Sequence, residues 1–341
     1  MNFINFQAWR EQTLRDDPGL LDCGETNLYR ALAAWRPQLD VADEGHAHRC
    51  DLARLWLTRY GFDAALSRNA LVCCGVRHAL ELIFKILAAE GDATIRLPQD
   101  IYPVYGELAR QAGLAPSTYA TLPVPLLPPI LPAPAPAPSG LSCGEYLLIA
   151  NPWKPLGRYL NEKECSHLVR WLEASPSRHL LIDAVYDLAV PFHETTRRLY
   201  ATGRAVLLHS LSKGWLHPKI FGIALIGENV THFAPIFRNH PPTQDSLRLA
   251  HALMTKAADL PSRIELELNR RSCQWMEAIP DQVRERFAAP VNETEGGYFF
   301  PVEITAMDLL QRHRIVGVPA SAFGAVNWHG SILTNLSAAF T

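Results

Sequence analysis

The chain has 341 residues, of which 48% are hydrophobic and 19% are charged, and its formal net charge at pH 7 is -2. This composition indicates a globular protein with a sizeable core, and the near-neutral charge gives no electrostatic basis for binding nucleic acid or an anionic membrane. No apolar run reaches the roughly 18 residues that a membrane-spanning helix needs.

The cysteines indicate a reducing environment. The chain has seven of them, scattered along its length, and the only adjacent pair is Cys73 and Cys74. Neither the odd count nor the spacing suggests a disulfide framework or a C-x-x-C metal site. The first residues, MNFINFQAWREQ, lack the basic-then-apolar layout of a signal peptide. We therefore expect free thiols, no bound metal and a cytoplasmic location.

From about residue 70 to residue 227, short apolar runs alternate with segments of helical periodicity. This alternation predicts an α/β domain of about 190 residues, with a parallel sheet wrapped by helices. The predicted strands span 70–75, 93–98, 145–152, 178–186, 205–212 and 221–227. The predicted helices span 76–91, 102–113 and 162–175.

A proline-rich stretch interrupts this pattern between Pro123 and Pro138, with eight prolines in sixteen residues. Proline lacks a backbone N–H and has a fixed φ, so the stretch can form neither a helix nor a central strand. We expect a stiff crossover on the surface of the large domain. A ligand for an SH3-type domain is the alternative.

The pattern changes from about Pro241 onward. Helical periodicity over 245–279 is followed by the segment EGGYFFPVEI, a further helix and the short apolar run RIVGVP. This order predicts a smaller α+β domain, which the N-terminal segment joins. The predicted division is an N-terminal segment 1–45, a large α/β domain 46–238 and a small domain 239–341.

Polar side chains stand where the predicted strands end. Ligands of open α/β sheets bind at the carboxyl ends of the strands. A helix that starts at Val76 offers N–H groups and a positive dipole end to a phosphate. A carboxylate can keep a pyridinium nitrogen protonated, and a lysine can form a Schiff base. The strand ends read Gly75 to Arg77, Pro98 to Tyr102, Asn151 with Pro152, Asp183 to Tyr186 and Ser210 to Lys213.

In this order, the motifs resemble those of the class I/II aminotransferases, the fold-type I enzymes that depend on pyridoxal 5'-phosphate (PLP). The segments that carry the resemblance are LVCCGVRHALELI, LPQDIYPVYGELARQAG, ANPWKPLGRYL, IDAVYDLAV, SLSK, EGGYFFPVEI and VGVPASAFG. They run from about residue 70 to 325, which is most of the chain. The resemblance implies the fold of PLP-dependent transferases, with PLP as cofactor and active sites at the interface of a homodimer.

The resemblance also implies roles for individual residues. Lys213 of SLSK would form the Schiff base with PLP and serve as the general base at the substrate Cα. Asp183 would bind the ring nitrogen, Tyr186 the phenolic oxygen and Ser210 the phosphate, while Tyr102 would stack on the pyridine ring. The residues expected to bind the cofactor are Gly75, Val76, Arg77, Tyr102, Asn151, Asp183, Tyr186, Ser210, Ser212, Lys213 and Lys219.

The expected phosphate site departs from the family pattern. An arginine normally follows the lysine by eight residues, and Phe221 stands at that position. Lys219 is the only lysine or arginine in that loop, and it would offer a point charge without the bidentate geometry of arginine. Arg77, in the phosphate loop itself, is the second candidate for the missing cation.

The substrate side departs further. Lys154 replaces the asparagine that contacts the phenolic oxygen, so either a lysine lies near that oxygen or the loop has shifted. The family's carboxylate-binding arginine is missing, because no lysine or arginine occurs from Ile315 to Thr341. His46 and His48 fall where a partner subunit's tyrosine would reach the phosphate, and they either replace it or lie in a solvated loop. The substrate-side candidates are Asn27, Tyr29, Trp153, Lys154, His217 and Asn335.

These features predict an aminotransferase that acts on an amino acid or amine, with a keto acid as acceptor and atypical carboxylate recognition. We expect it to serve a specialised biosynthetic pathway. A decarboxylase, a β/γ-eliminating lyase or a cyclase of the same fold is the alternative. A non-catalytic ligand-binding protein of this fold is a second alternative, which the joint presence of Lys213, Asp183, Tyr186 and Tyr102 disfavours.

Overall fold

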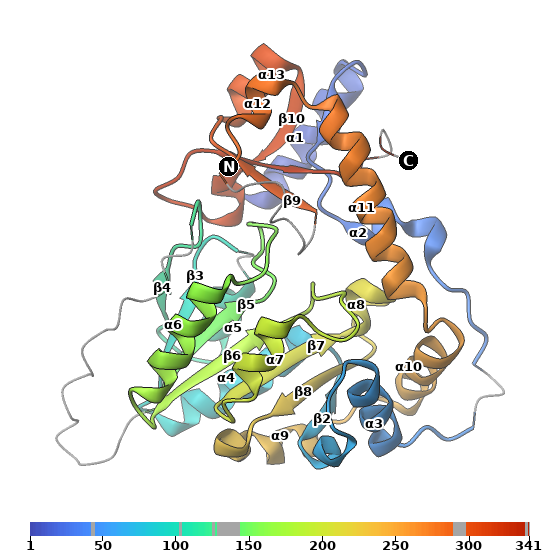
Figure 1. The fold of residues 1–341 in the computed structure, drawn as a ribbon, viewed down its shortest axis with the longest axis vertical. Coiled ribbons are helices and arrows are strands. Elements are labelled where there is room, and N and C mark those ends of the chain that lie inside the picture. Colours follow the sequence, from blue (N-terminus) through green and yellow to red (C-terminus); the bar gives the residue numbers. More distant parts are fainter. Residues whose placement is uncertain are drawn as a thin grey trace.

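The computed structural model describes residues 1–41, 45–101, 104–124, 127, 144–288, 298–337 and 340. Its main feature is a seven-stranded sheet with the strand order β2-β8-β7-β6-β5-β3-β4 (Figure 1). Strand β8 is antiparallel to both of its neighbours, whereas the pairs from β7 to β4 are all parallel. The strands are β2 (Ala70–Cys73), β3 (Thr94–Pro98), β4 (Ser117–Tyr119), β5 (Glu145–Ala150), β6 (Arg178–Asp183), β7 (Ala205–Ser210) and β8 (Gly222–Ile226). This is the mostly parallel α/β sheet that the sequence predicts.

Helices cover both faces of this sheet, as its sequence requires. Strands β5 to β8 are buried at every position, so their apolar side chains need cover on each side. Helices α6 and α7 lie together in front of the sheet in Figure 1, and α4 and α5 lie behind it. Their bounds are α4 (Val76–Glu90), α5 (Val104–Gln111), α6 (Glu162–Glu173) and α7 (Glu194–Tyr200), and α3 (Arg49–Arg59), α9 (Ala234–Asn239) and α10 (Gln244–Lys256) flank the sheet near β2.

A second, four-stranded sheet has the order β1-β10-β11-β9. The N-terminal strand β1 pairs in parallel with β10, so both ends of the chain contribute to this sheet, as the blue and red ribbons of Figure 1 show. It has a separate apolar core that includes Trp275, Phe300 and Leu333. The strands are β1 (Leu21–Cys23), β9 (Phe299–Val302), β10 (Ile315–Pro319) and β11 (Ser331–Thr334). The remaining helices are α1 (Phe3–Asp16), α2 (Leu28–Ala31), α8 (Leu211–Gly214), α11 (Leu260–Ala278), α12 (Asp281–Arg284) and α13 (Ala306–His313).

The structure differs from the sequence-based expectation in one long element. The helical periodicity over 245–279 is divided into α10 and α11, and the break lies at residues 257–259. Pro261 stands in the first turn of α11, where its missing N–H costs no intrahelical hydrogen bond. Helix α10 packs against α3, beside the large sheet, and α11 then leads to the small sheet (Figure 1).

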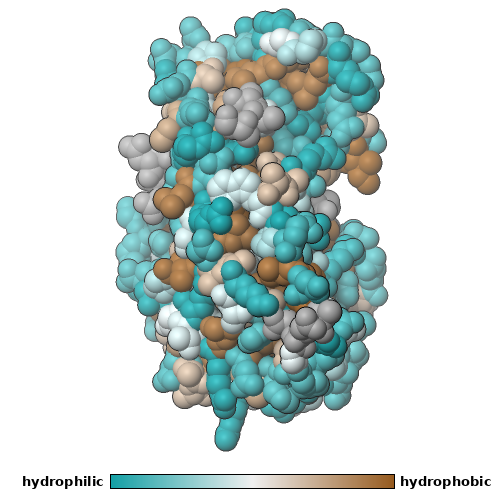
Figure 2. Space-filling model, turned by 90° about the vertical axis from the view of Figure 1, so that its right-hand side faces the viewer, coloured by the Kyte–Doolittle hydropathy of each residue, from teal (hydrophilic) through white to brown (hydrophobic). Residues whose placement is uncertain are grey.

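The face drawn in Figure 2 mixes hydrophilic and hydrophobic residues. Figure 2 shows scattered hydrophobic residues among hydrophilic ones, with an indented outline between the parts that hold the two sheets. Within the described residues, no helix is both long and apolar enough to span a bilayer, and the cysteines there are all free. The proline-rich crossover, 123–138, lies almost entirely outside the described residues.

Candidate active site

Lys213 lies in the short helix α8, directly after strand β7. Ser210, the last residue of β7, caps this helix by accepting a hydrogen bond from the backbone N–H of Ser212. Its hydroxyl also donates to the hydroxyl of Ser212, over 2.8 Å. The cap fixes the direction of α8 at the carboxyl edge of the sheet, and with it the position of Lys213.

The amine of Lys213 is held among aromatic rings. Nζ lies 4.6 Å from the ring centroid of Tyr29 and 4.9 Å from that of Tyr186. Burial lowers the pKa of Lys213 to about 8, and the nearby carboxylate of Asp183 partly offsets this effect. Within the described part of the chain, Nζ forms no hydrogen bond or ion pair. A largely desolvated amine without a fixed partner is suited to covalent chemistry.

Asp183 ends strand β6 as a buried carboxylate. The hydroxyl of Tyr105, on α5, donates a short hydrogen bond to Oδ2, and the backbone N–H of Val185 donates to Oδ1 over 3.0 Å. Burial raises the pKa of Asp183, whereas both hydrogen bonds and the neighbouring lysine charges lower it. Sequence reasoning missed Tyr105, and the available signal was its position three residues after Tyr102 in the segment IYPVY.

Lys154 lies beside Tyr186. Its Nζ donates to the hydroxyl of Tyr186 over 2.6 Å and lies 5.4 Å from the ring centroid of Phe299, on β9. Burial lowers the pKa of Lys154 to about 7, and the charge of Lys213 acts in the same direction. Of the two arrangements expected from the sequence, the structure has the one in which a lysine lies next to the residue expected at the phenolic oxygen.

The loop that carries Lys154 is fixed by its neighbours. Trp153 is buried, and its backbone N–H donates to the carbonyl of Arg158 over 2.7 Å. Gly157 has φ +77°, and a Cβ there would lie 1.9 Å from the carbonyl oxygen of Phe299. Only glycine can therefore bring this loop against β9, and the contact sets the direction of Lys154.

Asn151 is engaged within the fold. Its amide nitrogen donates to the hydroxyls of Thr195 and Thr196, over 3.0 Å and 2.9 Å. Its amide oxygen accepts from the backbone N–H of Leu160, over 2.9 Å. Both amide hydrogens are thus used to join the loop to α7, which leaves no donor of Asn151 for a cofactor.

The expected phosphate site lies where α4 meets the loop of Ser210. Gly75 has φ +126° and precedes α4, and a Cβ on it would lie 3.9 Å from Cβ of Ser210. A Cβ on Gly222 would lie 2.7 Å from Cα of Gly75, so the two glycines allow β8 and the start of α4 to meet. The first N–H groups of α4, including those of Val76 and Arg77, have no intrahelical acceptor and suit an anion.

Neither cation expected to replace the phosphate-binding arginine contacts these groups. Arg77 is exposed and pairs with Glu81 within α4, over 3.4 Å. Lys219 is exposed, with a positive φ of 65°. Phe221 is buried in the core. The anion-binding groups that the structure brings together are the N-terminus of α4 and the hydroxyls of Ser210 and Ser212.

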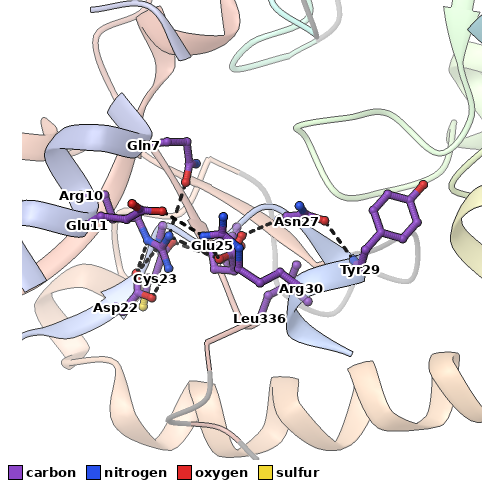
Figure 3. Close-up of polar contacts among 12 residues, drawn as sticks. Gln7, Arg10, Glu11, Asp22, Cys23, Glu25, Asn27, Tyr29, Arg30 and Leu336 are labelled. Atoms are coloured by element: carbon purple, nitrogen blue, oxygen red, sulfur yellow. Dashed lines mark hydrogen bonds and ion pairs between the residues drawn. The ribbon is translucent and has the colours of Figure 1, made fainter. Parts of the chain in front are cut away.

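The N-terminal segment reaches Lys213 through Tyr29. The Tyr29 hydroxyl is hydrogen-bonded to Ser212, and burial raises its pKa to about 12. Asn27 caps the short helix α2 by accepting from the backbone N–H of Tyr29, over 3.0 Å. Figure 3 shows Tyr29 extending away from the cluster of charged residues around Glu25.

The other substrate-side candidates are tied to other parts of the fold. Asn335 donates to the carbonyl of Leu268 and the hydroxyl of Ser272, both on α11. His217 is buried, and its Nε2 lies 3.3 Å from the carbonyl oxygen of Pro37. Trp153 packs against Tyr119, with 6.4 Å between ring centroids. Tyr102 lies outside the described residues.

His46 and His48 are exposed, with 4.8 Å between their rings. His48 lines a cavity of about 420 Å³ at the edge strand β2, and none of the site residues described above lines this cavity. Among the described residues, no three His, Cys, Asp or Glu side chains gather as metal ligands would.

The described residues fit PLP. Lys213 offers a largely desolvated amine without a fixed partner, and Asp183 offers a buried carboxylate for a protonated ring nitrogen. Tyr186 and Lys154 offer donors for a phenolate oxygen. The start of α4, with the hydroxyls of the capped helix α8, offers donors for a phosphate.

Comparison with known proteins agrees with this fit. The sequence profile of the family described as aminotransferase class I and II matches residues 44–332. A comparison with curated protein sequences finds no match.

Solved structures share the fold. YbdL from Escherichia coli, identified as having a methionine aminotransferase function, has a TM-score of 0.64 and 15% identity, over 100% of this chain and 95% of that chain. BacF from Bacillus subtilis has a TM-score of 0.67 and 14% identity, over 97% and 90%. A double mutant of aspartate aminotransferase from Thermus thermophilus has a TM-score of 0.63 and 16% identity, over 99% and 93%. At these identities, the likeness shows the fold alone.

Proposed function

The chain belongs to the class I and II aminotransferases, which are PLP-dependent transferases of fold type I, and from this we propose that it transfers the amino group of an amino acid or amine to a keto acid, with carboxylate recognition unlike that of its family. We assign it to specialised biosynthesis, because loss of the family's carboxylate-binding arginine suits a substrate outside general amino-acid metabolism. The observation that carries the proposal is the grouping of Lys213 with Asp183 and Tyr186 at the ends of neighbouring strands.

Each residue of this group has a role in the proposed reaction. PLP supplies an electrophilic aldehyde and an electron-accepting ring. Lys213 provides the amine for covalent attachment, and as a free amine it removes and returns the proton at the substrate Cα. Asp183 holds a proton on the ring nitrogen, and Tyr186 donates to the phenolic oxygen. The donors at the start of α4, with Ser210 and Ser212, bind the phosphate.

The organisation of the molecule completes the proposal. We assign residues 1–45 to a segment that joins the small domain, 46–238 to a large PLP-binding domain and 239–341 to the small domain. The pairing of β1 with β10 supports the first of these assignments. We further propose a homodimer, as the family resemblance implies, and a cytoplasmic location, which rests on the unpaired cysteines of the described chain.

Covalent labelling tests the attachment residue. Purified protein with PLP should be yellow, and borohydride reduction should remove the colour and leave the label on the peptide that contains Lys213. Lys213→Ala should bind PLP without a borohydride-stable label. A wild-type protein that takes up no PLP, or a label fixed at Lys154, would contradict the assignment.

The reaction type is tested with single amino acids and amines offered to the loaded protein. Transamination should convert the cofactor to its aminated form and release one keto acid or aldehyde per site. Release of CO2 or ammonia with unchanged PLP would instead favour the decarboxylase or lyase of the same fold.

A further inference from the structure

Two amines and one carboxylate define the charge of the site. The Nζ atoms of Lys154 and Lys213 both lie near the ring of Tyr186, at 4.5 Å and 4.9 Å from its centroid. The carboxylate of Asp183 faces both charges. Lys213 is assigned to covalent chemistry, and the ammonium of Lys154, which donates to the hydroxyl of Tyr186, is the other positive charge beside that ring.

No side chain at the family's usual carboxylate-binding position is available to bind a substrate carboxylate. No lysine or arginine occurs from Ile315 to Thr341, and the amide nitrogen of Asn335 donates into α11. The N-terminal segment does offer a buried guanidinium, that of Arg10, but it is committed to other partners (Figure 3). Its Nε donates to Asp22 over 2.8 Å, and its Nη1 donates to Glu25 over 3.3 Å.

Lys154 is held in the pocket by a loop that cannot easily move. The contact of Gly157 with the backbone of Phe299 fixes the loop, and the rings of Tyr186 and Phe299 flank the ammonium. A neighbouring hydroxyl points to the same ligand chemistry. Tyr298 is buried with its ring edge-on to Tyr186, 5.9 Å between centroids, and its hydroxyl interacts with the hydroxyl of Tyr186. The ammonium of Lys154 and the neighbouring phenol hydroxyl can both donate to an anion with oxygen acceptors.

We propose that Lys154 recognises the substrate carboxylate in place of the family's arginine, with Tyr298 as the neighbouring donor, so that the substrates are amino acids and not simple amines. This inference rests on the proposed function, because it assigns a substrate to that site. An ammonium is a compact point charge without the planar fork of arginine, so it attracts a carboxylate but fixes its orientation less. The recognition is therefore electrostatic and depends on the protonation of Lys154.

The test uses the PLP-loaded protein, with loading measured first by borohydride labelling at Lys213. Propionate and its neutral isostere propionamide are then titrated, and binding is followed by the change in cofactor absorbance. Wild-type protein should bind propionate at least about tenfold more tightly than propionamide. Lys154→Met should reduce this preference, the ratio of the two affinities in the same protein, to about one. Lys163→Met, which removes an exposed lysine on α6, is the matched control and should behave as wild type.

The pH dependence gives a second readout. Propionate binding should weaken between pH 6 and pH 8.5, because Lys154 has a pKa of about 7 and binds the anion only when protonated. Propionamide binding should stay flat over this range, and Lys154→Met should show no slope for either ligand. Replacement of Tyr298 by Phe should weaken propionate binding while keeping the slope.

The outcomes separate the two proposals. If Lys154→Met loses PLP, Lys154→Asn carries the test, because it restores the residue expected from the family, with its hydrogen-bonding amide, and removes the ammonium. A preference for propionate that survives in Lys154→Asn would overturn the role of Lys154. A wild-type protein that takes up no PLP overturns the proposed function, and this inference with it.

Discussion

Asp183 must stay ionised in a buried position to hold a proton on a ring nitrogen, and its charge depends on the donors around it. Burial raises the pKa of Asp183, whereas the hydrogen bonds from Tyr105 and Val185 lower it. The backbone donor is present with any residue except proline at position 185. Tyr105 is therefore the side chain whose hydrogen bond lowers the pKa of Asp183, and we assign it a positioning role.

Replacement of Tyr105 by Phe tests that role. Loss of the donor should raise the pKa of Asp183, so that activity is lost at a higher pH than in wild type as the pH falls. At pH 7 we expect kcat/KM to drop by roughly tenfold, as for loss of a hydrogen bond to a charged group. The measurement is the profile of kcat/KM against pH.

Tyr119→Phe is the matched control for this prediction. It removes another buried hydroxyl, which donates to the carbonyl of Leu148 over 2.7 Å and does not contact Asp183. Its pH profile should keep the wild-type position. An acidic limb that stays in place in Tyr105→Phe would show that the hydrogen bond does not control the carboxylate.

Individual residues were predictable from the sequence where a motif places them at a strand end. Lys213, Asp183 and Tyr186 follow buried apolar runs in chain order, and the fold brings their side chains together. Phe299, in contrast, begins strand β9, and Tyr298 directly precedes it, more than a hundred residues beyond Lys154 along the chain. Their contact with the pocket depends on how the small sheet packs on the large one, which no local pattern encodes.

Elements were predictable for the same reason that residues were. Strands β2, β3, β5, β6, β7 and β8 are fully or largely buried apolar runs, and each matches a predicted segment to within a few residues. Strands β1 and β4 are only three residues long, too short to show a period of two. The sequence shows one continuous helical periodicity over α10 and α11. Pro261 lies in the first turn of α11, and the sequence alone does not distinguish a proline there from a proline inside a helix.

The junction of β8 with the start of α4 is the element-level feature on which phosphate binding depends. Gly222→Ala would place a Cβ 2.7 Å from both Cα of Gly75 and the carbonyl oxygen of His209, so backbone must move. We expect α4 to shift and PLP affinity to fall by about tenfold or more, with a loss of about 1–3 kcal/mol in the free energy of unfolding. Fluorescence titration with PLP and urea unfolding measure the two effects.

Gly45→Ala provides the control, because a Cβ at Gly45 meets nothing within 4 Å. It should leave both PLP affinity and the free energy of unfolding near wild type. Gly222→Ala with unchanged PLP affinity would mean that the start of α4 does not bind the phosphate.

At the scale of the whole molecule, the N-terminal segment connects the small sheet to the active site. Strand β1 pairs with β10, and the hydroxyl of Thr334, on β11, donates to the backbone carbonyl of Glu25 over 2.7 Å. A few residues later, Tyr29 reaches Ser212 and Lys213. The change of pattern near Pro241 predicted a small domain that the N-terminal segment joins, but the register of β1 on β10 could not be read from the sequence of either strand.

Arg10 is the charged residue that holds this segment together. It is buried, it joins α1 to Asp22 and Glu25, and its removal would leave these two carboxylates without their buried cation (Figure 3). Arg10→Met should therefore lower the free energy of unfolding by about 3 kcal/mol, as for a broken buried ion pair. PLP affinity should fall as well, because Tyr29 depends on the same segment.

Arg30→Met is the control, since Arg30 pairs with the same Glu25 over 3.6 Å from a largely exposed position. An exposed pair contributes little, so this variant should lose less than about 1 kcal/mol and keep its PLP affinity. Urea unfolding of the two variants, with PLP titrations, makes the comparison. Equal losses in both would show that burial of Arg10 is not what ties the N-terminal segment to the active site.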